Sequence, residues 1–477
     1  VEDGELLEKL AALCEIPGVM EGSFDPEFLA LPREVLTTSL RDHQSALTVA
    51  SAQAKEEEKD LGKDSVTLLP RFLTVMDRPD DPAGRVRSGN EWVVAARLAD
   101  ARFFYGEDKK VGLERRAEQL ERLAFHEKLG SYADKSRRLM ELASAICEQL
   151  GWHEEKDSAR EAARLAKADL ATELVKEFTS LQGVMGGIYA REEGQPPAVW
   201  QAIYDQYRPA STDDPLPRGR VGLAVALADR MDTLAGIFGI GLVPTGSRDP
   251  FGLRRAAQAA VRIALEADME LSLEAIVSYA VDLYGDRVAR PAAAVVADLH
   301  PFLQDRVRYL LGLHGYAYDE IEAALAASIE GHPDDLPDLL QRVAALHEVR
   351  ERPEFLSIVL AAKRIANILK GAPSGRIDQS LLAEPAERQL ATSYETLHGE
   401  VHEAAVESDY RKALAKIAEF APVLDRFFVE VMVMVEDQAV RANRIALLQA
   451  IGRTLSRIAK LTEMVVDRAE LRARAQE

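Results

Sequence analysis

The chain has 477 residues, of which 47% are hydrophobic and 29% charged, and its formal net charge is −20 at pH 7. This length predicts about three or four domains rather than one core, and the composition excludes a disordered chain. No apolar run reaches the roughly 18 residues of a membrane helix, and two distant cysteines, Cys14 and Cys147, predict a reduced, cytoplasmic protein without a disulfide framework.

Residues 1–76 are expected to form a small α/β domain. Asp25-Pro26-Glu27 predicts a helical turn, because proline is favoured at the first position of a helix. The segments 35–40 and 66–75 have the β-branched bias of strands. The stretch 77–84 is rich in Asp, Pro and Gly, which predicts a loop and a domain boundary.

Residues 77–267 are expected to form a helical domain. Trp92, Ala95, Ala96, Ala99 and Phe103 recur at spacings of three and four, which is typical of an amphipathic helix. Further helices are predicted for 114–129, 135–150 and 159–178. Residues 219–267 predict a helix, a glycine-rich turn and a second helix.

The rest of the chain is also expected to be helical. Residues 268–370 form a predicted connecting region, which includes an acidic loop at 332–335. The segment 371–375 (Gly-Ala-Pro-Ser-Gly) predicts a linker, and 371–477 then predict a helix bundle. The fold class is therefore mainly α and multidomain.

Motifs for nucleotide chemistry are missing from the sequence. It contains no phosphate-binding loop, no nucleophile elbow and no zinc helix. The short signatures of class I aminoacyl-tRNA synthetases and the arginine-ending motif of class II ATP sites are also missing. We therefore expect no catalytic residue in this chain.

A segment with a possible anion site surrounds Asp249. Asp249 is expected to cap a helix that begins at Pro250, and the free N–H groups of its first turn would suit a phosphate. Arg248, Arg254 and Arg255 lie beside this turn. The alternative interpretation is a rigid turn in which the aspartate only caps the helix, and the residues alone favour that alternative.

The C-terminal helix offers a second basic surface. Its apolar face is predicted to contain Ile445, Leu448, Ile451, Leu455 and Ile458, which leaves Arg453, Arg457 and Lys460 together on another face. Between residues 438 and 477 there are eight Lys or Arg and four Asp or Glu, a local net charge of +4. This contrast with the whole chain predicts a surface that contacts phosphates, although a solvated helix face would give the same pattern.

Other basic residues of this region have different expected roles. Arg441 and Arg444 point toward the apolar side of the helix and are expected to pair internally, with Glu436 or Asp437. Lys363 and Arg364, which precede the linker, are weaker candidates for contacts with nucleic acid.

Ordered matches along nearly the whole chain resemble one family. The most specific run is Ala-Leu-Ala-Asp-x-x-Asp-Thr-Leu at 226–234, followed by Phe-Gly-Ile-Gly, Pro-Thr-Gly-Ser and Asp-Pro-Phe-Gly-Leu-Arg-Arg up to residue 255. Others are Leu-Pro-Arg-Glu-Val-Leu at 31–36, Leu-Gln-Gly-Val-Met-Gly at 181–186 and Arg-Ala-Asn-Arg-Ile-Ala-Leu-Leu at 441–448. This pattern resembles the β subunit of the bacterial two-chain glycyl-tRNA synthetase.

The resemblance implies a division of labour between two chains. The β subunit would bind tRNA(Gly), and a separate α subunit would hold ATP, magnesium and glycine, in an α2β2 assembly without membrane contact. The C-terminal bundle would be similar to DALR-type anticodon-binding domains. Chains of this family usually carry a further N-terminal region, and because this sequence begins with Val1 rather than Met, we expect it to be part of a longer gene product.

The helical middle of this family is similar to HD-type phosphohydrolases, which bind a metal through His and Asp side chains. The corresponding residues would be His126, Asp169 and either Asp229 or Asp232, but Ala168 stands where the pattern needs a histidine. We therefore expect a degenerate site without a metal. A working HD-type phosphohydrolase and a helical scaffold for protein partners are the alternative functions.

Overall fold

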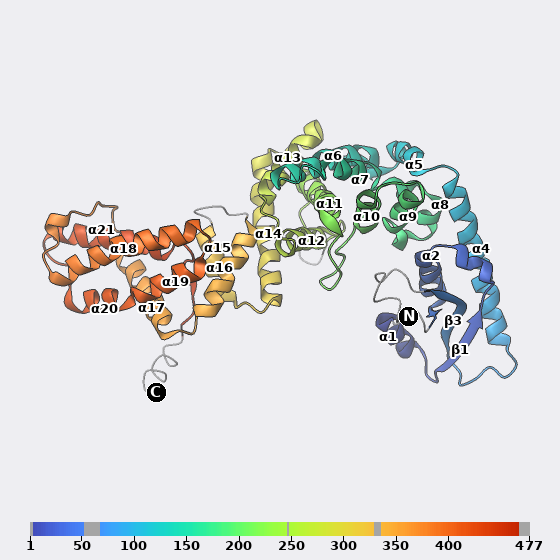
Figure 1. Ribbon diagram of the computed structural model, residues 1–477, viewed down its shortest axis with the longest axis horizontal. Helices are drawn as coiled ribbons and strands as arrows, with labels where there is room; N and C mark the ends of the chain where they lie inside the picture. The colour runs from blue at the N-terminus through green and yellow to red at the C-terminus, as the bar shows by residue number, and fades with distance from the viewer. Residues whose placement is uncertain (1–2, 52–66, 246–247, 329–334, 467–477) are drawn as a thin grey trace. The chain divides into compact units, whose positions relative to one another are not determined.

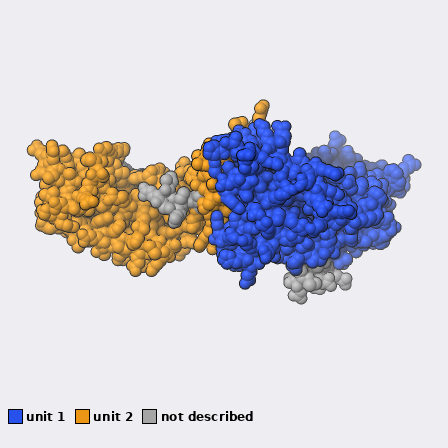
Figure 2. Space-filling model, turned by 90° about the horizontal axis from the view of Figure 1, so that it is seen from above, with its two compact units in different colours: residues 1–243, 279–292 blue, residues 244–278, 293–477 orange. Residues whose placement is uncertain are grey.

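The computed structural model describes residues 3–51, 67–245, 248–328 and 335–466. The chain divides into two compact units, which we call unit 1 (residues 1–243 and 279–292) and unit 2 (residues 244–278 and 293–477) (Figures 1 and 2). The division into four domains that the sequence suggests is finer than this one and stays a prediction. Within the described residues, no helix combines the length and the apolar character needed to cross a membrane.

Unit 1 begins with helix α1 (Gly4–Leu13) and a three-stranded antiparallel sheet. The strands β1 (Gly18–Ser23), β2 (Ala46–Ala50) and β3 (Leu68–Met76) lie in the order β1-β3-β2. Gly22 of β1 faces Phe72 of β3, and a Cβ atom at Gly22 would lie 2.3 Å from the Phe72 ring. The glycine therefore makes the room in which Phe72 is completely buried.

The strand predicted at 35–40 is wrong, because this segment is helical. The turn η1 (Pro26–Ala30), which the sequence predicted, is followed by helix α2 (Arg33–Thr38) and a π-helical turn, η2 (Ser39–His43). Val35, Leu36, Ser39 and Leu40 are all buried, and this spacing is that of one helix face. Burial of that face outweighs the β-branched bias. The strand predicted at 66–75 is confirmed as β3, except that residue 66 lies outside the described residues.

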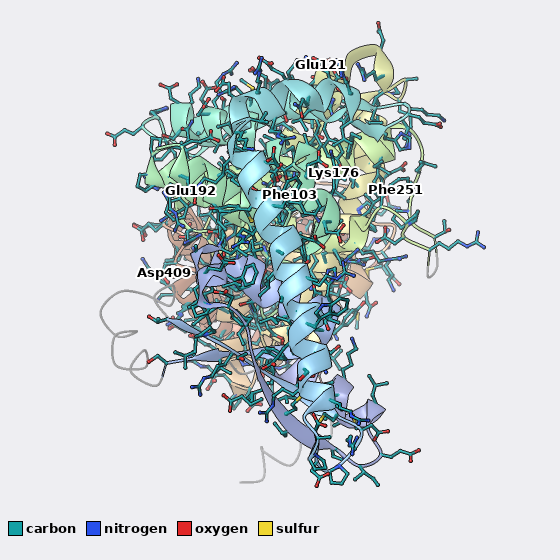
Figure 3. All side chains as sticks on the ribbon, turned by 90° about the vertical axis from the view of Figure 1, so that its right-hand side faces the viewer. Phe103, Glu121, Lys176, Glu192, Phe251 and Asp409 are labelled. Carbon is teal, nitrogen blue, oxygen red and sulfur yellow. The ribbon has the colours of Figure 1, made fainter. Side chains whose placement is uncertain are left out.

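Helix α4 (Arg85–Lys109) follows the predicted loop and contacts β1. Its buried apolar residues are Val94, Leu98 and Ala101. The apolar stripe seen in the sequence lies on another face, since Trp92 is 74% exposed and Phe103 is 61% exposed. Phe103 is labelled on this helix in Figure 3.

The helical middle of unit 1 is built around helix α11 (Gly219–Gly239), which is buried along most of its length. It packs against α6, α7 and α10. The elements that precede it are α5 (Leu113–Gln119), η3 (Leu120–Arg122), β4 (Ala124–His126), β5 (Gly130–Ser131), α6 (Tyr132–Gln149), α7 (Lys156–Leu165), η4 (Ala168–Ala171), α8 (Glu173–Glu177), η5 (Thr179–Leu181), α9 (Val184–Glu192) and α10 (Pro197–Asp205).

Two helices predicted in this region are interrupted. The helix expected at 114–129 ends at Gln119, and β4 and β5 then pair as a short hairpin. A capping box of Ser131 and Asp134 begins the next helix, α6, directly after it. The helix expected at 159–178 breaks into α7, η4 and α8. Thr172 caps α8 by accepting a hydrogen bond from the N–H of Val175, which starts a new helix.

Unit 2 is helical in its described residues, so the expected mainly α, multidomain fold is confirmed. Helix α17, which precedes the glycine-containing loop at 371–375, packs against α19, α20 and α21, and α18 packs against the same three helices. The elements from residue 253 onward are α12 (Leu253–Glu266), α13 (Leu273–Tyr284), η6 (Gly285–Arg287), α14 (Ala292–Leu313), α15 (Tyr318–Ser328), α16 (Leu336–Val349), α17 (Pro353–Ile368), η7 (Gln379–Leu381), α18 (Pro385–Val406), α19 (Tyr410–Glu419), α20 (Ala421–Glu430), α21 (Gln438–Leu455) and η8 (Leu461–Glu463). Of the predicted acidic loop, residues 332–334 lie outside the described residues, and Asp335 caps α16.

Candidate nucleic-acid interface and a buried charged cluster

A cavity of about 620 Å³ lies in unit 2 at the end of helix α21. Among the described residues, its lining combines three arginines and a histidine with tyrosine, threonine and small apolar side chains, and contains no carboxylate. The lining residues are Ala327, Arg342, Tyr394, His398, Ala405, Tyr410, Ala450, Arg453, Thr454, Arg457 and Ile458. In a chain of net charge −20, this concentration of positive charge indicates a site for an anion.

Helix α21 carries Arg453, one of the three arginines of the cavity. The Asp437 carboxylate accepts hydrogen bonds from the N–H groups of Ala439 and Val440 and so begins the helix. The apolar face predicted for Leu448, Ile451 and Leu455 is buried. Arg453 lies on another face and is exposed, as the sequence predicted.

The predicted helix is too long, because α21 ends at Leu455. Ile458 is buried as expected, but it lies in an irregular segment, where Arg457 and Lys460 are exposed. This segment is held in place by a hydrogen bond of 2.8 Å from the N–H of Lys460 to the carbonyl of Ala323 in α15. The three basic residues therefore remain neighbours in sequence on the surface of unit 2, without sharing one helix face.

The arginines of the cavity differ in whether they form ion pairs within the protein. Arg342 pairs with Asp338 at 2.7 Å and lies 5.2 Å from the centroid of the Tyr410 ring. Arg453 and Arg457 form no ion pair among the described residues, whereas Lys460 pairs with Glu463 at 3.0 Å. Arg453 and Arg457 are thus the two cations most available to a phosphate.

Aromatic rings lie beside these cations. His398 Nδ1 is 3.1 Å from the hydroxyl oxygen of Thr454, and the rings of Tyr394 and His398 are 5.7 Å apart. Rings of this kind can stack on an unpaired base while arginines bind its phosphates. The cavity therefore combines the two chemistries that single-stranded RNA requires.

The other basic candidates of unit 2 make contacts within the fold. Lys363 donates a hydrogen bond of 2.6 Å to the carbonyl of Met464, and the guanidinium of Arg364 lies 4.1 Å from the centroid of the Phe428 ring. Arg444 is buried and pairs with Glu387 of α18, so the expected internal pairing is confirmed but the expected partner is wrong. Contacts of Lys363 and Arg364 with nucleic acid stay predictions.

The anion site predicted at Asp249 is wrong in its helix geometry. Helix α12 begins at Leu253, not at Pro250. The Asp249 carboxylate accepts hydrogen bonds of 2.8 and 2.9 Å from the N–H groups of Leu253 and Arg254. A carboxylate of the chain thus occupies donors that a phosphate would need, which confirms the alternative that Asp249 caps the helix. Roles for Arg248, Arg254 and Arg255 in tRNA binding stay predictions.

In unit 1, five charged side chains form what we call the buried cluster: Lys135, Arg138, Lys167, Asp229 and Asp232. Lys167 pairs with Asp229 at 2.9 Å, and Lys135 pairs with both aspartates at 2.9 Å. Arg138 pairs with Asp232 at 2.6 Å, and Asp232 is completely buried. Each charge in the cluster therefore has an opposite charge in direct contact.

The ammonium groups set the charge state of these aspartates. Burial alone would raise the pKa of Asp229, but the nearby Lys135 and Lys167 hold it well below its usual range. The same opposition acts on Asp232, whose pKa is lowered against the effect of burial by Lys135 and Arg138. Both carboxylates are ionised at neutral pH.

The other two residues of the degenerate HD-type site, Asp169 and His126, accept hydrogen bonds from backbone N–H groups. Asp169 accepts hydrogen bonds of 2.5 and 3.1 Å from the N–H groups of Gly183 and Gly186, and its burial raises its pKa to about 6. His126 lies in the hairpin, where its Nδ1 accepts a hydrogen bond of 3.2 Å from the N–H of Lys128.

The residues present do not fit the metal of an HD-type enzyme. Two lysine ammonium groups lie against the carboxylate of Asp229, where a cation would have to approach, and they would repel it. Within the part of the chain that the structure describes, His, Cys, Asp and Glu form no group suited to a metal ion.

The sequence analysis did not single out Lys135 and Arg138, although a signal was present. They lie on the same face of α6 as the buried Leu139 and Leu142, at spacings of three, four and seven. Charged residues on an apolar helix face indicate internal partners. The cavity residues Arg342, Tyr394 and His398 gave no such signal, because the cavity forms only when α16, which carries Arg342, packs near α18, which carries Tyr394 and His398.

Comparisons with known proteins agree with this architecture. Residues 1–326 match the family model of the glycyl-tRNA synthetase beta subunit, and residues 358–465 match that of the DALR anticodon binding domain. The glycine–tRNA ligase beta subunit of Acidobacterium capsulatum is 42% identical over 97% of this chain. Those of Leptothrix cholodnii and Geobacter metallireducens are each 39% identical, also over 97% of the chain.

The C-terminal match defines the class of protein: a mainly helical chain with an anticodon-binding-type bundle. This bundle contains most of the residues that line the basic cavity. The chain as a whole belongs to the glycyl-tRNA synthetase β-subunit family. It spans 65%, 64% and 65% of the length of these three relatives.

Proposed function

We propose that this chain binds tRNA(Gly) and holds it for glycylation by a separate catalytic α subunit. The observation that carries the proposal is the cavity at the end of α21, where Arg453 and Arg457 meet Arg342 and His398 and the described lining residues include no carboxylate. The names of the relatives, which are beta subunits of a glycine–tRNA ligase, supply the amino acid and imply the partner.

In this proposal the chain contributes position rather than a catalytic side chain. The α subunit would hold ATP, magnesium and glycine, and the two chains would assemble as α2β2 in the cytoplasm. Fixing the tRNA so that its acceptor end meets the activated glycine removes translational and rotational freedom before the reaction, which can lower the barrier by several kcal/mol. The HD-type phosphohydrolase is not proposed, because the buried cluster holds its own cations.

The decisive test is binding of tRNA(Gly) by a variant with reversed charges, measured by gel shift at graded salt. The triple variant Arg453→Glu, Arg457→Glu, Lys460→Glu should lose tRNA binding and keep its melting temperature, since all three side chains are exposed. Wild-type binding should weaken steeply as salt rises. Unchanged binding by the triple variant would mean that the tRNA contacts another surface.

A matched control reverses three other positive charges of unit 2. Lys412, Lys416 and Arg426 are basic residues of α19 and α20, and each already pairs with a carboxylate. Their triple replacement by Glu changes the net charge by the same amount, so it should weaken tRNA binding far less than the cavity variant. Equal losses would show that net charge alone controls binding.

A further inference from the structure

We infer that a second cleft, in unit 1, binds an unpaired nucleotide of an RNA strand. The cleft has a volume of about 670 Å³ and lies between α2, α4, α9 and α10. Three aromatic side chains (Tyr105, Trp200 and Tyr204) and three arginines (Arg33, Arg191 and Arg218) are among its lining residues. A cleft of this size lies within the range of small-ligand sites.

The aromatic rings are held in fixed positions at the wall of the cleft. The Tyr204 hydroxyl donates a hydrogen bond of 3.0 Å to Glu34 of α2, and the Tyr105 hydroxyl donates one to Glu192 of α9 (labelled in Figure 3). Trp200 and both tyrosines are only partly buried. Tyr105 already stacks on Tyr189, with ring centroids 5.8 Å apart, so a planar base is expected at Trp200 and Tyr204.

Guanidinium groups lie over the rings of Trp200 and Tyr204, where a base could stack on a ring or on a guanidinium plane. Those of Arg191 and Arg218 lie 5.5 and 5.6 Å from the centroid of the Trp200 ring, and Arg218 also lies 5.2 Å from that of Tyr204. An arginine next to an aromatic ring offers a planar stacking surface together with donors for a phosphate. This combination favours a nucleotide over an apolar ligand.

Of the three arginines of the cleft, Arg33 and Arg218 already interact within the fold, so Arg191 is the cation expected to meet a ligand. Arg218 is used by the fold, because it pairs with the completely buried Asp205 at 2.6 Å. The charge of Glu192 is offset by Lys109 at 3.1 Å. Arg191 is exposed and forms no ion pair among the described residues. We therefore expect the phosphate to meet Arg191, while the base lies against Trp200 and Tyr204.

The ligand is an unpaired nucleotide because stacking needs a free base face. In a duplex each base is covered by its neighbours, whereas a base at a strand end or in a loop can enter a cleft. The inference rests on the proposed function in one respect, that the strand belongs to the same tRNA. The residues involved lie in unit 1 and do not include the cavity of unit 2.

The test uses the fluorescence of Trp200. The chain has three tryptophans, so the variant Trp92→Phe, Trp152→Phe leaves Trp200 as the only one. Titration with tetra-adenylate RNA should change this fluorescence to saturation, and a fully paired RNA hairpin should not. No change with tetra-adenylate, or an equal change with the hairpin, would overturn the inference.

Affinity is measured in parallel by anisotropy of fluorescein-labelled tetra-adenylate. Arg191→Ala and Trp200→Leu should each weaken binding about tenfold, which corresponds to the loss of one stacked base or one phosphate contact. Arg115→Ala is the matched control, because Arg115 is an exposed arginine of unit 1 outside the cleft. Binding that is equally strong in all variants would overturn the inference.

Two further probes separate the outcomes. Adenosine monophosphate should bind more weakly than tetra-adenylate, and inorganic phosphate should not change Trp200 fluorescence; a change with phosphate alone would overturn the stacking site. Loss of tRNA binding in the charge-reversed variant of unit 2, together with no response of Trp200, would refute the nucleotide cleft and leave the proposed function intact. Unchanged tRNA binding in that variant, together with the expected response of Trp200, would refute the proposed function and support the cleft.

Discussion

Unit 1 and unit 2 each gather positive charge in one place, but they use it differently. In the buried cluster of unit 1, Lys135, Lys167 and Arg138 are matched by Asp229 and Asp232 at direct contact distance. In the cavity of unit 2, Arg453 and Arg457 are exposed and form no ion pair among the described residues. Buried charges that pair with one another are not available to a ligand, and removal of one partner leaves an uncompensated buried charge, whereas charge left in solvent is available to a ligand.

The largest expected effect comes from breaking the buried cluster. Asp232→Ala leaves Lys135 and Arg138 buried beside one carboxylate fewer, which should lower the free energy of unfolding by about 3–5 kcal/mol. Urea unfolding followed by circular dichroism measures this. As a control, Glu121→Ala removes an ion pair whose side chains are 60% and 58% exposed, and it should cost less than about 1 kcal/mol. Similar stabilities of the two variants would contradict the assignment.

A pH titration sharpens the comparison within unit 1. Burial raises the pKa of Asp169 to about 6 from 3.8, so the folded state binds its proton more tightly than the unfolded state. Wild type should therefore lose stability from this group as pH rises from about 4 to about 6. Relative to wild type, Asp169→Asn should gain roughly 3 kcal/mol between pH 4 and pH 7. A constant difference across this range would mean that Asp169 does not titrate in it.

The corresponding change in unit 2 should affect binding but not folding. Arg453→Ala combined with Arg457→Ala removes two phosphate contacts, so the slope of log affinity against log salt should fall by about 2. The free energy of unfolding should stay within about 0.5 kcal/mol of wild type, because both side chains are exposed. If the variant unfolded more easily and bound tRNA normally, these arginines would have a structural role instead.

The smallest effect is expected at Lys460. Its charge is shared with Glu463 at 3.0 Å, so it is less available than the two arginines. Lys460→Ala should weaken tRNA binding less than threefold, which corresponds to about 0.6 kcal/mol. A loss as large as that of the double arginine variant would place Lys460 among the main contacts.

The sequence predicted features that depend on neighbouring residues. The helical class, the helix of α6, the loop at 77–84 and the exposure of Arg453 all follow from local spacing. The hairpin at 124–131 was missed, because the preceding apolar spacing also fits a helix that continues. The face of α4 was misjudged for a related reason: spacing identifies a helix but does not say which stripe the fold covers.

Features that depend on distant residues could not be read in the same way. Arg444 was expected to pair with Glu436 or Asp437, yet its partner, Glu387, lies 57 residues away on another helix. The cavity of unit 2 collects side chains from α15, α16, α18, α19 and α21, so the excess of basic over acidic side chains among its described lining residues becomes visible only after folding. The family resemblance suggested the proposed function, but it assigned no individual contact.

The buried cluster has a consequence for the conditions under which this protein can fold. Lys135 and Lys167 place covalently attached cations against Asp229, where an HD-type enzyme would recruit a metal from solution. These positive charges are side chains of the same polypeptide, so they are present in every molecule, and a chelator cannot remove them. Assembly of unit 1 is therefore expected to be independent of the supply of divalent ions, with the same melting temperature in EDTA as in magnesium.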